Sequence, residues 1–156
     1  MFQGDLIYYP EMPVLAVRAK SWGAWLDTTP DVYRKRWFAD VKFRAAQNDH
    51  HYDLVESLKR DGQKEPILVE PKPYRLNRPN YFYVEPGGSR WPAMVYLGWE
   101  TCKAMLMWKS EFAELINERF SHLKQEKHTI ESAKQFFGEH SPTYQRILEK
   151  WQYGQE

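Results

Sequence analysis

The chain of 156 residues lacks several features that would mark particular classes of protein. It holds one cysteine, Cys102, so no disulfide can form within the chain. In the apolar stretch "CKAML" this thiol is interpreted as a small buried side chain, with a reactive thiol as the alternative. The sequence shows no leader, long apolar run or low-complexity tract, which predicts a cytoplasmic protein without membrane contact.

Charge of either sign is not in excess. The 22 basic and 21 acidic residues give a formal net charge of +1, so no global field would draw the chain onto a nucleic acid or an anionic membrane. DNA binding would need a local patch, and "YRKRWF" at residues 33–38 is the candidate because it alternates basic and aromatic side chains. A helix that covers its own core with long side chains explains this stretch equally well.

Aromatic residues, in contrast, are abundant, with seven Trp, ten Tyr and eight Phe. They predict either a core built from large side chains or a surface that stacks on bases or partners. The length suits one domain over residues 1–156. We divide it into an N-terminal extension (1–49), a core (50–108) and C-terminal helices (109–156).

Hydrophobic patterning predicts helices and strands from His50 onward. A helix over 50–62 has Leu54, Val55 and Leu58 on one face and Gly62 as its terminator. Three strands are predicted over 65–71, 81–84 and 102–108, and a helix over 89–98. Ser89 is the expected cap of the helix over 89–98, and further helices are expected to begin at the caps Thr29, Ser110, Thr129 and Ser141.

The N-terminal extension is harder to interpret. "LIYYP" at 6–10 and "PVLAVRA" at 13–19 predict two short strands, which Pro10 and Pro13 would confine to sheet edges or strand ends.

A glycine turn joins the strand "YFYV" to the next helix in "NYFYVEPGGSRWPA". Gly87 and Gly88 would let the backbone approach a phosphate, Ser89 could donate a hydroxyl hydrogen bond, and Arg90 could bind phosphate oxygens. The positive end of the helix dipole favours an anion at the same place. A plain turn without a ligand is the alternative.

Three segments in this order resemble the ParB/sulfiredoxin superfamily. "LVESLKRDGQKEPILV" looks like its helix, glycine turn and Pro-Ile strand; "NYFYVEPGGSRWPA" looks like its strand and phosphate loop; and "GGSRWPAMVYLG" is similar to the ParB box. The resemblance implies an α/β (α+β) fold with a small mixed sheet, extended by N-terminal strands and C-terminal helices. It also implies that the loop holds the phosphates of ATP or CTP, with Gly87 and Arg90 on the family's shared positions and Ala93 on its small packing residue.

The loop departs from the family at two positions. Gly88 stands where sulfiredoxin has its catalytic cysteine, and a shift of one residue puts Ser89 there instead. Neither residue supplies a thiolate, so we do not expect sulfinic acid reduction. Against the ParB box, Gly88 and Ser89 replace a glutamate and an arginine, which weakens the expectation of a CTP clamp.

Charged residues beside this loop suggest roles in phosphoryl transfer. Glu65 is the candidate general base and Lys64 could neutralise phosphate charge, although both also suit a solvated turn. Glu85 could hold Mg²⁺ through water, with the nucleotide's phosphates as further ligands. The pair His50-His51 is not expected to bind a metal because adjacent helical residues point in different directions.

The leading expectation is therefore a nucleotide-binding protein that holds ATP or CTP, with NTP hydrolysis or phosphoryl transfer as reactions that it could support. A DNA-associated, partition-like or nuclease-like protein of a phage or other mobile element is the second. A catalytically inactive module that binds a protein partner is the third.

Overall fold

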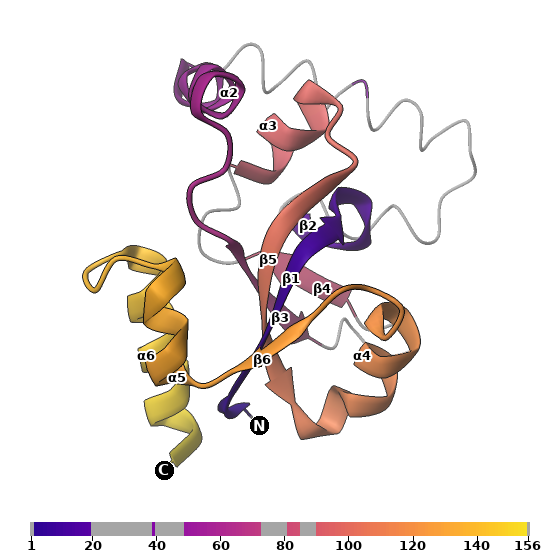
Figure 1. Cartoon of the computed structure of the whole chain (residues 1–156), viewed down its shortest axis with the longest axis vertical. Helices are drawn as coiled ribbons and strands as arrows, with labels where there is room; N and C mark the ends of the chain where they lie inside the picture. Colours follow the sequence, from indigo (N-terminus) through magenta and orange to yellow (C-terminus); the bar gives the residue numbers. More distant parts are fainter. Residues whose placement is uncertain (1, 20–38, 40–48, 73–80, 85–89, 156) are drawn as a thin grey trace.

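The structure is a computed structural model of the chain, and it describes residues 2–19, 39, 49–72, 81–84 and 90–155 (Figure 1). The predicted helix after Thr29, the stretch 33–38, and Glu85, Gly87, Gly88 and Ser89 lie outside the described residues.

One mixed sheet organises the described part of the chain. Its strands lie in the order β2-β4-β3-β5-β1-β6. They are β1 (Phe2–Pro13), β2 (Arg18–Ala19), β3 (Ile67–Lys72), β4 (Tyr81–Val84), β5 (Thr101–Lys109) and β6 (Glu126–His128). The pairs β3-β5 and β2-β4 are parallel, and the other neighbours are antiparallel. The expected α+β class, with a mixed sheet, added N-terminal strands and C-terminal helices, is confirmed.

The prediction of two short N-terminal strands is confirmed in part: Pro13 ends a strand and β2 lies at the sheet edge, but the first strand is longer than predicted and most of 13–19 is not strand. β1 is a single strand of 12 residues that lies between β5 and β6. Pro10 is tolerated there because the register with β5 shifts between Tyr9 and Met12, so its missing N–H falls in an irregular part of the ladder. The chain then forms a 3₁₀ turn, η1 (Val14–Ala16), and a β2 of only two residues.

Three helices cover one face of the sheet: α2 (Asp49–Asp61), α3 (Arg90–Leu97) and α4 (Ala113–Phe120). The predicted stop of α2 is confirmed, since Gly62 has φ 72° and its N–H bonds to the Leu58 carbonyl at 2.9 Å. The predicted Ser110 cap is wrong, because the 3₁₀ turn η3 (Ser110–Phe112) precedes α4 and no side chain caps that helix.

Large aromatic side chains fill the core under these helices. Trp91, Tyr9, Phe82 and Phe120 are fully buried, and the Phe120 ring lies 5.6 Å from Tyr9 and 4.8 Å from Phe82 between ring centroids. For these residues the interpretation as core is confirmed.

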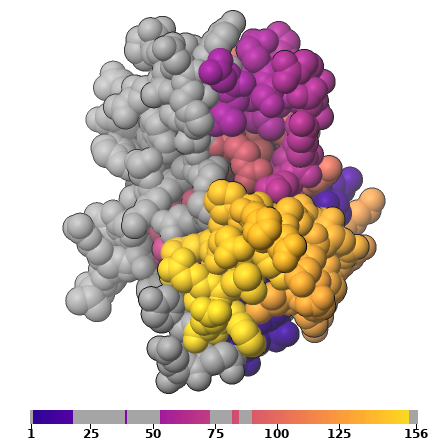
Figure 2. All heavy atoms as spheres, turned by 90° about the vertical axis from the view of Figure 1, so that its left-hand side faces the viewer, coloured from indigo at the N-terminus to yellow at the C-terminus, as the bar shows by residue number. Residues whose placement is uncertain are grey.

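The C-terminal segment covers the opposite face with α5 (Ile130–Ala133), the 3₁₀ turn η4 (Lys134–Phe136) and α6 (Pro142–Gln155) (Figure 1). In the space-filling view this segment, yellow to orange, forms much of one side of the molecule below α2 (Figure 2). Both predicted caps are confirmed: Thr129 forms a reciprocal capping box with Ser132, and the Ser141 hydroxyl accepts from the Tyr144 N–H at 3.1 Å. The helix after Thr129 is shorter than predicted, because it tightens into η4.

Within the described residues, no helix is long and apolar enough to cross a membrane.

Candidate functional site

Arg90 is the first residue of α3 and is half-buried. Its Nη1 donates a hydrogen bond of 3.0 Å to the backbone carbonyl oxygen of Glu65, which lies 25 residues earlier in the chain. Burial lowers the pKa of Arg90, and the nearby Glu65 carboxylate opposes this shift. An arginine remains cationic in proteins, so the start of α3 carries a partly desolvated and oriented positive charge.

Glu65 lies in the connection between α2 and β3, just before the strand begins. Its carbonyl oxygen also accepts a hydrogen bond of 2.9 Å from the Gln63 side chain. Its carboxylate Oε1 accepts one of 3.4 Å from the N–H of Gly138, in the connection between η4 and α6. Glu65 therefore joins the start of α3 to the C-terminal segment, while its neighbour Lys64 is exposed.

Gln63 also belongs to this site, and the sequence alone gives no sign that its side chain holds two segments together. Its Nε2 donates to the Lys103 carbonyl at 2.8 Å, and its Oε1 accepts from the Lys103 N–H at 2.8 Å. The side-chain amide thus pairs with β5 as a strand residue would, and it holds the 63–65 connection against that strand.

Cys102 lies on β5 beside this region and is 4% exposed. Burial raises the pKa of its thiol to about 12, and the charge of Arg90 opposes that rise. The interpretation of Cys102 as a buried side chain is confirmed, and the thiol stays protonated at neutral pH.

The structure thus brings together two of the residues that the sequence singled out, Arg90 and Glu65. The four predicted ligands between positions 85 and 89 lie outside the described residues. Within the described ranges, no group of three or more His, Cys, Asp or Glu side chains could hold a metal ion.

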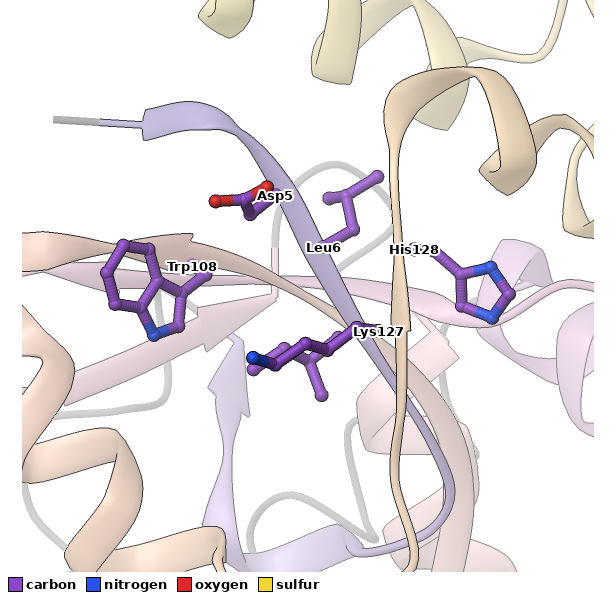
Figure 3. Close-up of a pocket in the computed structure, with 6 residues that line it drawn as sticks. Asp5, Leu6, Trp108, Lys127 and His128 are labelled. Atoms are coloured by element: carbon purple, nitrogen blue, oxygen red, sulfur yellow. The ribbon is translucent and has the colours of Figure 1, made fainter.

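A separate hollow of about 230 Å³ lies where β1, β5 and β6 meet (Figure 3). The side chains of Asp5, Trp108 and Lys127 extend on one side of these strands, whereas the His128 ring extends on the other. The His128 ring packs against Phe136 with centroids 5.0 Å apart, so it belongs to the packing of the other sheet face.

A further hollow of about 450 Å³ lies beside η1 and the end of α3. Its lining includes Leu15, Val95 and Trp99. Leu15 is 47% exposed, and Tyr96, which follows Val95 in the sequence, is 41% exposed, so two large apolar side chains are exposed in this region.

In comparisons with known proteins, no protein-family model, curated protein or solved structure matches the chain. Fold and site together define an α+β protein with an oriented arginine at a helix start, and the ParB/sulfiredoxin resemblance stays a prediction.

Proposed function

We propose that this protein binds the phosphate groups of a ribonucleoside triphosphate, ATP or CTP, at the start of α3. The observation that carries the proposal is the hydrogen bond from Arg90 to the Glu65 carbonyl, which fixes the guanidinium at a helix N-terminus. The first N–H groups of a helix lack intrahelical partners and its dipole is positive at this end, so an anion is favoured there.

Orientation of Arg90 before binding reduces the entropy lost when a phosphate binds. A guanidinium carries five N–H donors, so one bond to the Glu65 carbonyl leaves capacity for phosphate oxygens. In the sequence, Gly87, Gly88 and Ser89 directly precede Arg90, and they would supply backbone and hydroxyl donors. Lys64, exposed beside Glu65, would add a second positive charge.

Phosphoryl transfer would be a further step at the same site. Glu65 is the candidate base, because the hydrogen bond from Arg90 to its backbone carbonyl keeps the residue beside the start of α3. Magnesium would be held by the nucleotide's phosphates, with Glu85 as a ligand through water. A Glu65→Gln variant would then bind nucleotide and lose turnover, which separates catalysis from binding.

Titration calorimetry with ATP and CTP in the presence of MgCl₂ tests the proposal. Arg90→Ala should weaken binding about tenfold or more, because a charge-assisted hydrogen bond is removed. Arg90→Lys should recover part of it, since the charge stays while the planar fork is absent. Arg60→Ala is the matched control, because Arg60 is exposed on α2 and pairs with its neighbour Asp61.

Circular dichroism shows whether each variant keeps the fold. Absence of heat with both nucleotides for the wild-type chain would overturn the proposal. So would a folded Arg90→Ala variant that binds as tightly as the wild type.

A further inference from the structure

Two polar side chains of β6 lie on the same face of that strand. Glu126 and His128 are two residues apart, and β6 pairs with β1 so that Tyr8 lies opposite Glu126. His128 Nε2 lies 3.2 Å from Glu126 Oε2, within hydrogen-bond distance. The imidazole is 10% exposed and the Glu126 side chain is 65% exposed. A largely buried ring is therefore joined to a carboxylate at the protein surface.

Ser132 contacts the other nitrogen of the same imidazole. After β6 the chain turns at Thr129 into α5, which brings Ser132, four residues after His128, back to the ring. Ser132 Oγ lies 3.0 Å from His128 Nδ1. Ser132 is an exposed residue, so a molecule from solvent could reach it. A hydroxyl, an imidazole and a carboxylate thus follow one another, and we call Ser132, His128 and Glu126 the serine triad.

The hydrogen bonds around His128 assign its protons. A neutral imidazole carries one N–H and an ionised carboxylate only accepts, so the contact with Glu126 assigns the proton to Nε2. Nδ1 is then the acceptor for the Ser132 hydroxyl. Ser132 Oγ accepts from the Thr129 N–H at 2.9 Å, which leaves its own proton for another acceptor. Nδ1 at 3.0 Å is closer than the Thr129 carbonyl oxygen at 3.3 Å.

Aromatic side chains fix the orientation of the His128 ring. The Phe136 ring meets it edge to face, with centroids 5.0 Å apart and 87° between the planes, and Tyr8 lies edge-on at 6.4 Å. Tyr8 and Phe136 also pack on each other, with centroids 4.3 Å apart. Both are half-buried, so they offer apolar surface beside the serine triad. A base that is held in this way keeps both nitrogens aimed at their partners.

We propose that the serine triad is a nucleophilic site that hydrolyses carboxylic esters with a small acyl group and an aromatic leaving group. In such a site the imidazole takes the proton of the serine hydroxyl, and the carboxylate stabilises the imidazolium that forms. Here Nδ1 contacts the serine and Nε2 contacts the carboxylate, which reverses the more common arrangement. The roles are unchanged because either ring nitrogen can accept a proton. The aromatic leaving group would lie on Tyr8 and Phe136.

The proposed reaction has two halves. Ser132 Oγ attacks the ester carbonyl carbon while its proton moves to His128 Nδ1. The bond to the leaving group then breaks, the departing oxygen takes that proton, and an acyl-serine remains. Water attacks the acyl carbon and gives a proton to Nδ1, and this proton returns to Oγ as the carboxylic acid leaves. The Gln135 amide, whose Nε2 lies 3.4 Å from Nδ1, is the side-chain donor beside the reacting atoms for the oxyanion.

The competing explanation is that these residues only join the end of β6 to α5. Thr129 and Ser132 do form a capping box, which Ser132→Ala would remove. Glu126→Gln separates the two explanations. Its amide oxygen still accepts from Nε2 and the capping box stays, whereas the charge that stabilises the imidazolium is lost. The serine triad shares no residue with the Arg90 site, so this proposal and the proposed function can fail independently.

Hydrolysis of p-nitrophenyl acetate by the full chain measures the activity. Ser132→Ala and His128→Gln should each lower kcat/KM about tenfold or more, because each removes a group that takes part in the chemical step. Glu126→Gln should lower it about tenfold. The matched controls Ser121→Ala and His122→Gln change exposed residues at the end of α4 and should match the wild type.

A fluorophosphonate probe tests the nucleophile directly. Oγ displaces fluoride at phosphorus, His128 takes the hydroxyl proton, and mass spectrometry detects the phosphonylated serine. Ser132 should be labelled in the wild type, and labelling should be lost in His128→Gln, which keeps the hydroxyl. Thr129→Ala weakens the capping box and keeps the serine triad, so Ser132 should still be labelled. Circular dichroism shows whether each variant is folded.

The proposal is supported if Ser132 is labelled and the three folded triad variants lose hydrolysis while the two controls keep it. It is overturned if Ser132 of the wild type stays unlabelled. It is also overturned if folded Ser132→Ala hydrolyses the ester as fast as the wild type. Equal labelling of Ser121 and Ser132 would overturn it as well, because the hydroxyl of Ser132 would then not be activated.

Discussion

The indole Nε1 of Trp91 donates a buried hydrogen bond of 2.8 Å to the backbone carbonyl oxygen of Val14, 77 residues earlier in the chain. Trp91 is 0% exposed and directly follows Arg90. This bond fixes the start of α3 to the η1 turn after β1. The orientation of Arg90 thus depends on the N-terminal part of the sheet as well as on Glu65.

Trp91→Phe should lower the free energy of unfolding by about 2 kcal/mol, because the Val14 carbonyl would be buried without its donor. Urea unfolding followed by circular dichroism measures this difference. Trp151→Phe, at a side chain that is 36% exposed, is the matched control and should change stability less. Equal effects of the two substitutions would show that the Val14 bond is not what stabilises this region.

Gly62→Ala should destabilise the protein by about 1 kcal/mol. The reason is backbone strain, since Gly62 has φ 72° while no atom of the described residues outside its chain neighbours lies within 4 Å of the position that a Cβ would take. Gly62→Asn should destabilise less, because asparagine tolerates this conformation. Gly138→Ala is the control, because its φ is not positive and, among the described residues, nothing crowds the position of an added Cβ. Thermal unfolding compares the variants. A Gly62→Ala variant as stable as Gly138→Ala would contradict the prediction.

Gln63→Glu should weaken the attachment of the 63–65 connection to β5. The carboxylate keeps the acceptor for the Lys103 N–H but cannot donate to the Lys103 and Glu65 carbonyl oxygens. We expect a decrease of about 1 kcal/mol in the free energy of unfolding by urea. In hydrogen exchange, the β5 amides near Lys103 should exchange faster. The exposed Gln3→Glu change carries the same charge and should alter neither measurement.

Local signals in the sequence predict much of the fold. They identify α2 and α6 because the caps, terminators and apolar spacing of these helices lie within or beside the helix itself. They make the first strand too short because Pro10 is a local breaker, whereas β1 extends from Phe2 to Pro13 through its long pairing with β5. They do not reveal β6 because Glu126–His128 is polar and short, and it forms only by pairing with residues 6–8 of β1.

The site is predictable in part. The loop and its resemblance single out Arg90 and Glu65, and the structure brings these residues together, although through the Glu65 carbonyl rather than its carboxylate. The ion pairs of Glu70 with Arg146 and Lys150 give no signal in the sequence, because Glu70 and Arg146 are 76 residues apart in the chain. The sequence places Glu70 in a buried strand, and only the fold shows that α6 supplies its counter-ions.

Alkaline pH should destabilise the protein through Cys102. Burial raises the pKa of the folded thiol from its ordinary 9.0 to about 12, so above pH 9 the unfolded chain releases a proton that the folded chain keeps. The contribution of this group is fully present below pH 9 and is lost as the pH rises toward about 12. In that window stability should fall by up to about 1.4 kcal/mol per pH unit for this one proton.

Other groups also titrate in this range, and the pKa of Tyr9 is raised by burial as well. Cys102→Ala isolates the thiol, because the smaller side chain shifts stability by an amount that does not depend on pH. The difference in urea unfolding free energy between wild type and variant should therefore change as the pH rises above 9. A constant difference would mean that the folded thiol titrates near its ordinary pKa. The same folded protein should then react readily with a thiol reagent near pH 8, where a protonated, buried Cys102 reacts only after unfolding.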